Sequence, residues 1–368
     1  SITPNFQIRK LQVMTSKNLS FKTPVSARVL NYSICPVFVA SHVAVELGWL
    51  EEELASVGAS ARYLGSLTRD EQNIAHHQHT LPFQIRDGGN IPPTWSHARG
   101  AENVVIGTTG FNSGGQIVVR ADSGIYTLAD LTGRKVALSR SNADYRADWW
   151  RANSEFGLLL LLRLGGLTFD DVELIEIPAI ESTAHLPPVS RLSERWPQTE
   201  RESLAFNLPE VVALGDGRVD AIFSNQGRSE ILEKTGQFKV IEDLRRYPDW
   251  TLNAPSGPYL ITASRTLLDQ SPEIAIAFLK ASIRAGRWIA DNRREAAIIL
   301  NRVTYQATAE DVLRDIADID FVPSLSAQNI ANLTSLKDFL FEHEYIKNDF
   351  EISSWIDGQF LKAALDDL

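Results

Sequence analysis

The sequence predicts an α/β protein of two lobes, in which each lobe is a mostly parallel sheet flanked by helices. Segments of strand composition alternate with segments of helical periodicity, which is the pattern of strand–helix–strand units. The chain has 368 residues, and because single hydrophobic cores stop growing at about 250–300 residues, two lobes are expected. Hydrophobic residues make up 44% and charged residues 22%, the balance of an ordinary globular protein.

The first strand is expected over residues 25–34, where β-branched and aromatic residues predominate. A helix is expected to begin at Pro36, since proline suits the first helical position, and Cys35 would then be its N-cap. A leucine-rich helix is expected over 156–164. Further strands are expected over residues 104–107, 116–120, 135–138, 172–177 and 221–224.

The last third of the chain has helical periodicity throughout. Helices are expected over residues 272–290, 294–303, 309–316 and 326–343. The proline-rich and charge-rich segment 183–203 is expected to be a surface excursion inside a domain. The glycine-rich segments 107–115 and 253–257 are expected to carry the chain between the lobes.

The charge balance argues against a nucleic-acid or membrane partner. The chain has 46 acidic and 36 basic residues, a net charge of −10, so a general basic surface is absent from the sequence. The longest apolar run, at residues 156–162, is far shorter than the roughly 20 residues that a membrane-spanning helix needs. We expect a monomer that binds a small molecule.

The sequence has one cysteine, Cys35, which excludes an internal disulfide and any zinc or iron–sulfur site built from several cysteines. The only methionine is Met14, and no basic-then-apolar secretory signal follows it. If Met14 is the natural start, residues 1–13 are a leader or added sequence and the protein is expected in the cytoplasm. Alternatively, Ser1 is a processed N-terminus and the protein is periplasmic.

Cys35 is the first candidate functional residue. A thiol at a helix N-terminus meets free backbone N–H groups and the positive end of the helix dipole, and both favour the thiolate. The alternative is an inert buried cysteine, since free cysteine is among the most buried residue types.

Three histidines, His76, His77 and His79, follow each other closely. Neighbouring side chains do not converge on a helix or a strand, and no H-E-x-x-H spacing is present, so a metal site is not expected. One histidine is instead expected as a hydrogen-bond partner or an acid–base group. Residues 107–115 contain neither nucleotide-binding glycine motif, so a phosphate-binding loop is not expected there.

Arg86 precedes Gly88 and Gly89, a combination that suits an oxyanion. The guanidinium offers a planar pair of donors, and glycine lets backbone N–H groups approach the ligand. The alternative is a surface arginine in a turn. Trp149 and Trp150 are candidates either for an aromatic-binding pocket or for the core.

The order of elements resembles the type II periplasmic solute-binding proteins, most clearly at residues 114–138, which look like the crossing strand, short helix and second-lobe strand of that superfamily. This resemblance implies an arm over 1–23, a first lobe built from 24–121 and 251–368, and a second lobe over 122–250. The ligand would lie in a cleft between the lobes. Fold alone does not decide function.

Three motifs together resemble the aromatic sulfinate desulfinases. The residues that carry the likeness are Tyr32–Ser33–Ile34–Cys35–Pro36–Val37, His76, and Arg86–x–Gly88–Gly89–x–Ile91–Pro92–Pro93. His76 stands ten residues before Arg86, as in the family pattern, and residues 339–361 resemble the family's tail. The resemblance implies an intracellular hydrolase without a cofactor, which cleaves the C–S bond of an aromatic sulfinate and releases sulfite.

The resemblance also implies the roles of single residues. Cys35 would be the catalytic thiol, acting either as nucleophile on sulfur or as proton donor to the ring carbon, and His76 would be its hydrogen-bonding partner. Arg86 and the Gly89 N–H would hold the sulfinate oxygens. The implied substrate contacts are Arg86, Gly88, Gly89, His77 and Trp150. The chain departs from the family pattern at Ile34, His77 and residues 223–228, which are expected to shape the cleft, so the resemblance does not fix the substrate.

Two other functions fit the same motifs. A non-catalytic solute-binding protein of an ABC transporter, for an aromatic or sulfonate-type ligand, would have the same fold. A thiol-dependent enzyme for a different anion, such as a carboxylate, would use Arg86 in the same way.

Overall fold

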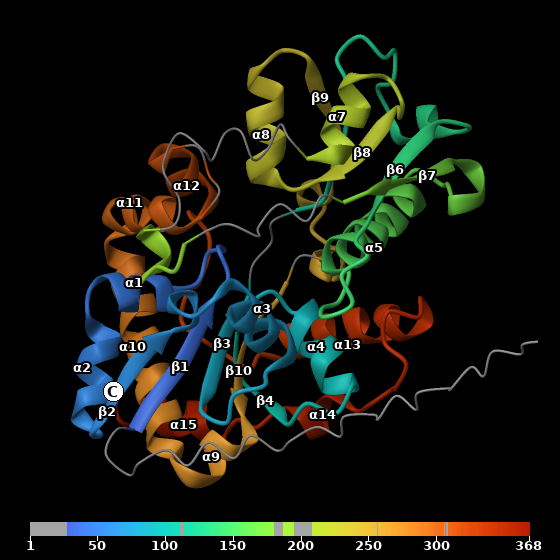
Figure 1. The fold of residues 1–368 in the computed structure, drawn as a ribbon. Coiled ribbons are helices and arrows are strands. Elements are labelled where there is room, and N and C mark those ends of the chain that lie inside the picture. Colours follow the sequence, from blue (N-terminus) through green and yellow to red (C-terminus); the bar gives the residue numbers. More distant parts are fainter. Residues whose placement is uncertain are drawn as a thin grey trace, which may run out of the picture.

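The computed structural model describes residues 28–110, 114–179, 187–194, 208–255, 257–304, 306 and 308–368. In these ranges the strands form two five-stranded sheets, one in each of two lobes (Figure 1). The first sheet has the order β2-β1-β3-β10-β4 and the second the order β7-β6-β8-β5-β9. The two-lobed α/β fold expected from the sequence is confirmed.

The first sheet contains β1 (Arg28–Ile34), β2 (Ala59–Tyr63), β3 (Gln84–Gly88), β4 (Asn103–Thr109) and β10 (Tyr259–Ser264). The second contains β5 (Gln116–Arg120), β6 (Lys135–Arg140), β7 (Glu173–Pro178), β8 (Ala221–Ser224) and β9 (Phe238–Asp243). The strands expected from the sequence are all present. Strands β2, β3, β9 and β10 are additional to that expectation.

Each sheet is parallel except where the chain enters it from the other lobe. Strand β1 runs parallel to β2 and β3, and β6 runs parallel to β7 and β8. Strands β5 and β10, the first strands after the two crossings, run antiparallel to both of their neighbours. Strand β5 therefore belongs to the second sheet, whereas the expected first lobe extended to residue 121. The domain boundaries stay a prediction, and the strand order favours a crossing before β5.

Helices cover both faces of each sheet (Figure 1). Those of the first lobe are α1 (Ala40–Glu46), α2 (Trp49–Ser56), α3 (Arg69–Gln78), α4 (Ile91–Ala98), α9 (Arg265–Gln270), α10 (Pro272–Asp291), α11 (Arg293–Val303), α12 (Ala309–Asp315), α13 (Ala327–Glu342), α14 (Ile352–Trp355) and α15 (Gln359–Asp366). Those of the second lobe are α5 (Trp149–Leu164), α7 (Pro209–Gly215) and α8 (Gln226–Lys234).

Short 3₁₀ turns join several of these elements. They are η1 (Leu64–Ser66), η2 (Leu128–Leu131), η3 (Phe169–Asp171), η4 (Leu192–Glu194), η5 (Leu244–Arg246) and η6 (Trp250–Asn253). The helices expected over the last third of the chain are confirmed within one or two residues at each end. Within the described residues, no helix has the length and apolar character needed to cross a bilayer.

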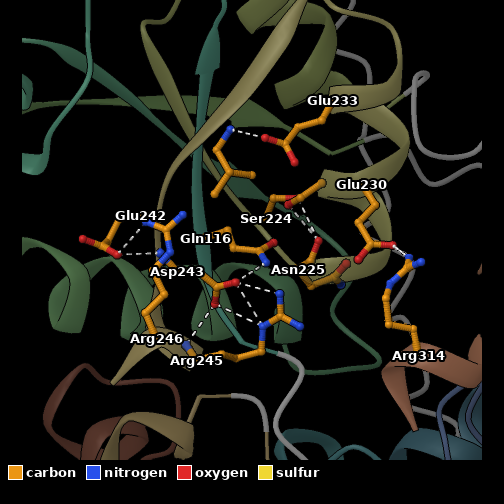
Figure 2. Close-up of polar contacts among 12 residues, drawn as sticks. Gln116, Ser224, Asn225, Glu230, Glu233, Glu242, Asp243, Arg245, Arg246 and Arg314 are labelled. Atoms are coloured by element: carbon orange, nitrogen blue, oxygen red, sulfur yellow. Dashed lines mark hydrogen bonds and ion pairs between the residues drawn. The ribbon is translucent and has the colours of Figure 1, made fainter. Parts of the chain in front are cut away.

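The two lobes touch through aromatic and charged side chains. Phe156 of α5 stacks on Phe339 of α13, with ring centroids 4.3 Å apart, inside a shared hydrophobic cluster. Between α8 and α12, Glu230 accepts a hydrogen bond from Arg314 at 2.8 Å (Figure 2). Such part-exposed ion pairs contribute about 1 kcal/mol or less each, so the stacked apolar contact is the stronger tie.

Most of the described residues of the segment 183–203 are exposed, as expected of a surface excursion, but the segment also reaches the first lobe. Its described part, residues 187–194, packs against the first lobe: Leu192 is 8% exposed in the core cluster of α1, α2 and α10. The Val189 N–H donates to the Gly65 carbonyl at 2.9 Å, and Ser193 Oγ donates to Glu46 at 2.7 Å. The buried Leu192 side chain therefore anchors this part of the segment on the first lobe, although the segment is mostly polar. The rest of 183–203 lies outside the described residues.

Candidate active site

Cys35 lies in a turn that follows β1, and it is not the N-cap of a helix. Helix α1 begins at Ala40, after an extended Val39. The Val37 N–H donates to the Cys35 carbonyl at 2.7 Å, which makes a three-residue turn in place of the first helical turn. The expected helix start at Pro36 is therefore wrong, and the helix dipole does not act on the thiol.

A cation takes the place of the helix dipole at the sulfur. Arg86 Nη2 donates to Cys35 Sγ at 3.2 Å, and Arg86 Nη1 donates to the Gly89 carbonyl at 2.7 Å. Arg86 stands on β3 and is 1% exposed, so it is not the surface arginine of the alternative interpretation. Arg86 therefore places a positive charge in contact with the sulfur.

His76 completes the surroundings of the thiol. It lies in the last turn of α3, with Nε2 3.5 Å from Cys35 Sγ and Nδ1 2.9 Å from Ser33 Oγ. Burial, and next the charge of Arg86, hold the pKa of His76 well below its usual range. The imidazole is therefore neutral, and one of its nitrogens donates while the other accepts. The structure thus brings Cys35, His76 and Arg86 together, as the sequence motifs predict.

Gly88 makes room for the sulfur. Its φ is 146°, a value that favours glycine, and a Cβ there would overlap the Cys35 side chain, 2.5 Å from Sγ. At Gly89, by contrast, a Cβ would meet no atom of the described residues within 4 Å. The Gly89 carbonyl is used by Arg86. That the Gly89 N–H holds a ligand oxygen stays a prediction.

The neighbouring residues His77 and His79 contact different partners. His79 Nε2 lies 3.1 Å from Thr262 Oγ1, and the His77 ring makes an edge contact with Tyr145 of the second lobe. The described residues contain no group of three His, Cys, Asp or Glu side chains arranged to hold a metal ion. His77 therefore lies where the lobes meet, and its role as a substrate contact stays a prediction.

Trp150 makes its contacts within the second lobe. Its Nε1 donates to Glu210 at 2.8 Å, and the guanidinium of Arg228 lies 4.3 Å from its ring centroid. Arg228 also forms a buried ion pair with Glu210 at 3.1 Å. These contacts fix the indole, and its role as a substrate contact stays a prediction.

Three buried polar residues around Cys35 were not predicted to be part of the site. Ser33 binds His76, Ser41 donates to the Asp87 carboxyl at 2.5 Å, and His42 Nε2 lies 2.8 Å from the Cys35 carbonyl oxygen. Strand alternation could have indicated Ser33, since it pairs with Arg86 in the register of β1 and β3. Nothing local in the sequence marks Ser41 or His42.

Gly88→Ala should destabilise the protein and disturb Cys35, since the new methyl group strains the backbone and overlaps the cysteine side chain. We expect a loss of about 1–3 kcal/mol in the free energy of unfolding, measured by urea denaturation. Gly89→Ala is the matched control, because a Cβ there has space, and it should change stability by less than about 0.5 kcal/mol. Equal stability of the two variants would contradict this account of Gly88.

Acid should destabilise the protein through its buried histidines. Burial lowers the pKa of His42 to about 4 and of His77 and His79 to about 3, and holds that of His76 well below 6.5. Three carboxyls act in the opposite direction, since burial raises the pKa of Asp87 and Asp315 to about 7 and also raises that of Asp148. Burial also lowers the pKa of His97. Among the described residues, five histidines therefore outnumber three carboxyls, so between pH 6.5 and 4 the unfolded chain binds more protons than the folded one.

The free energy of unfolding should therefore fall as the pH falls from 6.5, by about 1.4 kcal/mol per pH unit for each net proton. Urea denaturation from pH 7 to pH 5 measures it. His77→Gln removes one of these histidines and should flatten the slope by about one proton. A stability that stays constant or rises toward pH 5 in the wild type would contradict the buried neutral histidines.

The comparisons with known proteins point to one group of enzymes. No family model matches the sequence. The chain is 27% identical over 365 residues to the 2'-hydroxybiphenyl-2-sulfinate desulfinase of Rhodococcus erythropolis, which covers 91% of this chain and 93% of that protein. The desulfinase of Rhodococcus qingshengii has the same identity and coverage.

Solved structures share the fold. The desulfurization enzyme DszB aligns with a TM-score of 0.70 at 23% identity, covering 92% of this chain and 99% of that one. Its mutant in complex with biphenyl-2-sulfinic acid aligns with a TM-score of 0.69 at 23% identity, covering 93% and 99%. The aliphatic sulphonate binding protein SsuA of Escherichia coli aligns with 0.63 at 17% identity, covering 90% and 92%. The chain therefore resembles the aromatic sulfinate desulfinases over most of its length, on a fold shared with periplasmic sulfonate-binding proteins.

Proposed function

We propose that the chain is a hydrolase that cleaves the C–S bond of an aromatic sulfinate and releases sulfite. The observation that carries the proposal is the placement of the Cys35 sulfur between the Arg86 guanidinium and the His76 imidazole. The likeness to desulfinases along most of the chain supports an enzyme that acts on a carbon–sulfur bond.

The electrostatics of Arg86 favour an anionic substrate. The guanidinium is buried, and among the described residues no carboxylate forms an ion pair with it. Its Nε is likewise buried without a hydrogen-bond partner in the described part of the chain. A buried charge without a counter-ion costs several kcal/mol, so an anion that binds here recovers that cost. A sulfinate offers two oxygens to the planar guanidinium.

The reaction balances with water as the only co-substrate. An aryl sulfinate and one water give the arene and hydrogen sulfite. In one route the Cys35 thiol transfers its proton to the ring carbon, sulfur dioxide leaves and is hydrated, and the thiolate regains a proton from that hydration. In the other, Cys35 forms a bond to the sulfinate sulfur while the arene leaves with the thiol proton, and water then releases sulfite and restores the thiol.

Neutral His76 suits both routes. It lies within reach of the sulfur and is held by Ser33, so it orients the thiol and exchanges a proton with it. A charged imidazole would instead be repelled by Arg86 and would have no free nitrogen to accept a proton from the thiol. Because its pKa lies well below the usual range, His76 keeps an accepting nitrogen at neutral pH.

Cys35→Ser should abolish sulfite release from aryl sulfinates while leaving substrate affinity nearly intact, because serine fills the same space without a comparably reactive group. A sulfite assay over a panel of aryl sulfinates, combined with calorimetric titration of each variant, measures both. Turnover by the serine variant at the wild-type rate would remove Cys35 from the mechanism.

Arg86→Met should weaken sulfinate binding, because methionine keeps the length of the side chain and removes its charge. The loss of one partner of a desolvated charge pair costs about 2–5 kcal/mol, which corresponds to a rise of at least about thirtyfold in Kd. Arg293→Met is the control: Arg293 is also held by backbone carbonyls, but those of Ile316 and Ile319 beside α11. A Kd that is unchanged in Arg86→Met would contradict the oxyanion site.

A solute-binding protein for an aromatic or sulfonate-type ligand is the second candidate function. The fold likeness to SsuA favours it. A binding protein has no need of a thiol beside its anion site, so the contacts of Cys35 with Arg86 and His76 favour the enzyme. The same panel separates the two functions, since a binding protein would take up a ligand tightly and release no sulfite.

A further inference from the structure

The backbone of Cys35 is held from two sides. Its N–H donates to the Asp87 carbonyl on β3 at 2.9 Å. On the other side its carbonyl oxygen lies 2.8 Å from His42 Nε2 on α1. Because Arg86 precedes Asp87 on β3, the first bond sets the cysteine turn next to the guanidinium. The second bond sets the rotation of the same turn against α1.

The bond from His42 has a defined direction. His42 is 2% exposed, and burial lowers its pKa to about 4, so the ring is neutral near pH 7. A carbonyl oxygen only accepts, and Nε2 therefore carries the proton. The preceding residue, Ser41, donates to the Asp87 carboxyl at 2.5 Å, so α1 is tied to β3 as well as to the cysteine turn.

We propose that His42 is a positioning residue for Cys35: its hydrogen bond to the Cys35 carbonyl fixes the turn that aims the sulfur at Arg86. The catalytic consequence rests on the proposed function, whereas the consequence for thiol reactivity does not. A merely structural histidine would contribute to stability alone, and its loss would leave the reactivity of Cys35 unchanged in the folded protein.

Alkylation tests the proposal directly, because Cys35 is the only cysteine and iodoacetamide reports on it alone. His42→Leu fills the space without a donor, and His42→Gln places an amide donor at a comparable reach. At pH 7 the rate of alkylation should fall about tenfold in His42→Leu, since displacement of a reacting group by about 1 Å has effects of this order or larger. His42→Gln should keep most of the wild-type rate. With an aryl sulfinate, kcat should fall in His42→Leu while KM stays nearly constant.

Thr304→Val is the control, since it removes another buried side-chain donor to a backbone carbonyl: the Thr304 hydroxyl, next to the end of α11, donates to the Leu300 carbonyl. It should leave alkylation unchanged. Alkylation of folded His42→Leu at the wild-type rate or faster would overturn the proposal. If His42→Leu does not fold, His42→Asn replaces it, because its shorter amide does not reach the carbonyl. A wild-type protein that releases no sulfite would contradict the proposed function, while the alkylation rates would still decide the role of His42.

Discussion

The charge of Arg86 is the constraint on which the centre of the first lobe depends. A guanidinium that is 1% exposed needs compensation for the hydration that it loses, and the described residues supply only the Gly89 carbonyl and the Cys35 sulfur. The surrounding histidines are neutral, because burial and the same positive charge depress their pKa values. The protein therefore keeps a buried cation that forms no ion pair among the described residues, which costs stability and favours the binding of an anion.

The polar groups around this cation are held by hydrogen bonds and close packing. Gly88 lets its strand approach the cysteine side chain, Ser33 lies within hydrogen-bond distance of His76, and α1 holds the cysteine turn through His42. Hydrogen bonds in such a site are strong because the dielectric constant is low, and they cost little reorganisation during a reaction. These contacts fix the position of the Cys35 sulfur relative to the sheet.

The sequence was a good guide wherever hydrophobic periodicity decides the structure. The strand at 116–120 and helix α10 show that periodicity plainly, and both are present. Strand β3 was missed because its Arg86, Asp87 and Gly88 are poor strand formers, which pairing with β1 and β10 holds in place. Pro36 gave a local signal for a helix start, but the tertiary contacts of the Cys35 turn outweigh it. That the thiol lies beside the guanidinium was expected only from the resemblance, since residues 51 positions apart are joined by no local rule.

The single positive charge beside the Cys35 sulfur also limits the charge of the anion that this region can accommodate. Among the described residues, Arg86 is the one cation that contacts Cys35, and Tyr259, whose pKa is raised by burial and then by the Cys35 charge, remains a neutral phenol. A single buried cation compensates one negative charge, so a doubly charged ligand would bring an unpaired charge into a region of low dielectric constant. A sulfinate carries one charge on two oxygens, whereas the sulfite it yields approaches a second ionisation in water. In the proposed reaction, Arg86 would compensate the single charge of the sulfinate and would leave one charge of a fully ionised sulfite uncompensated.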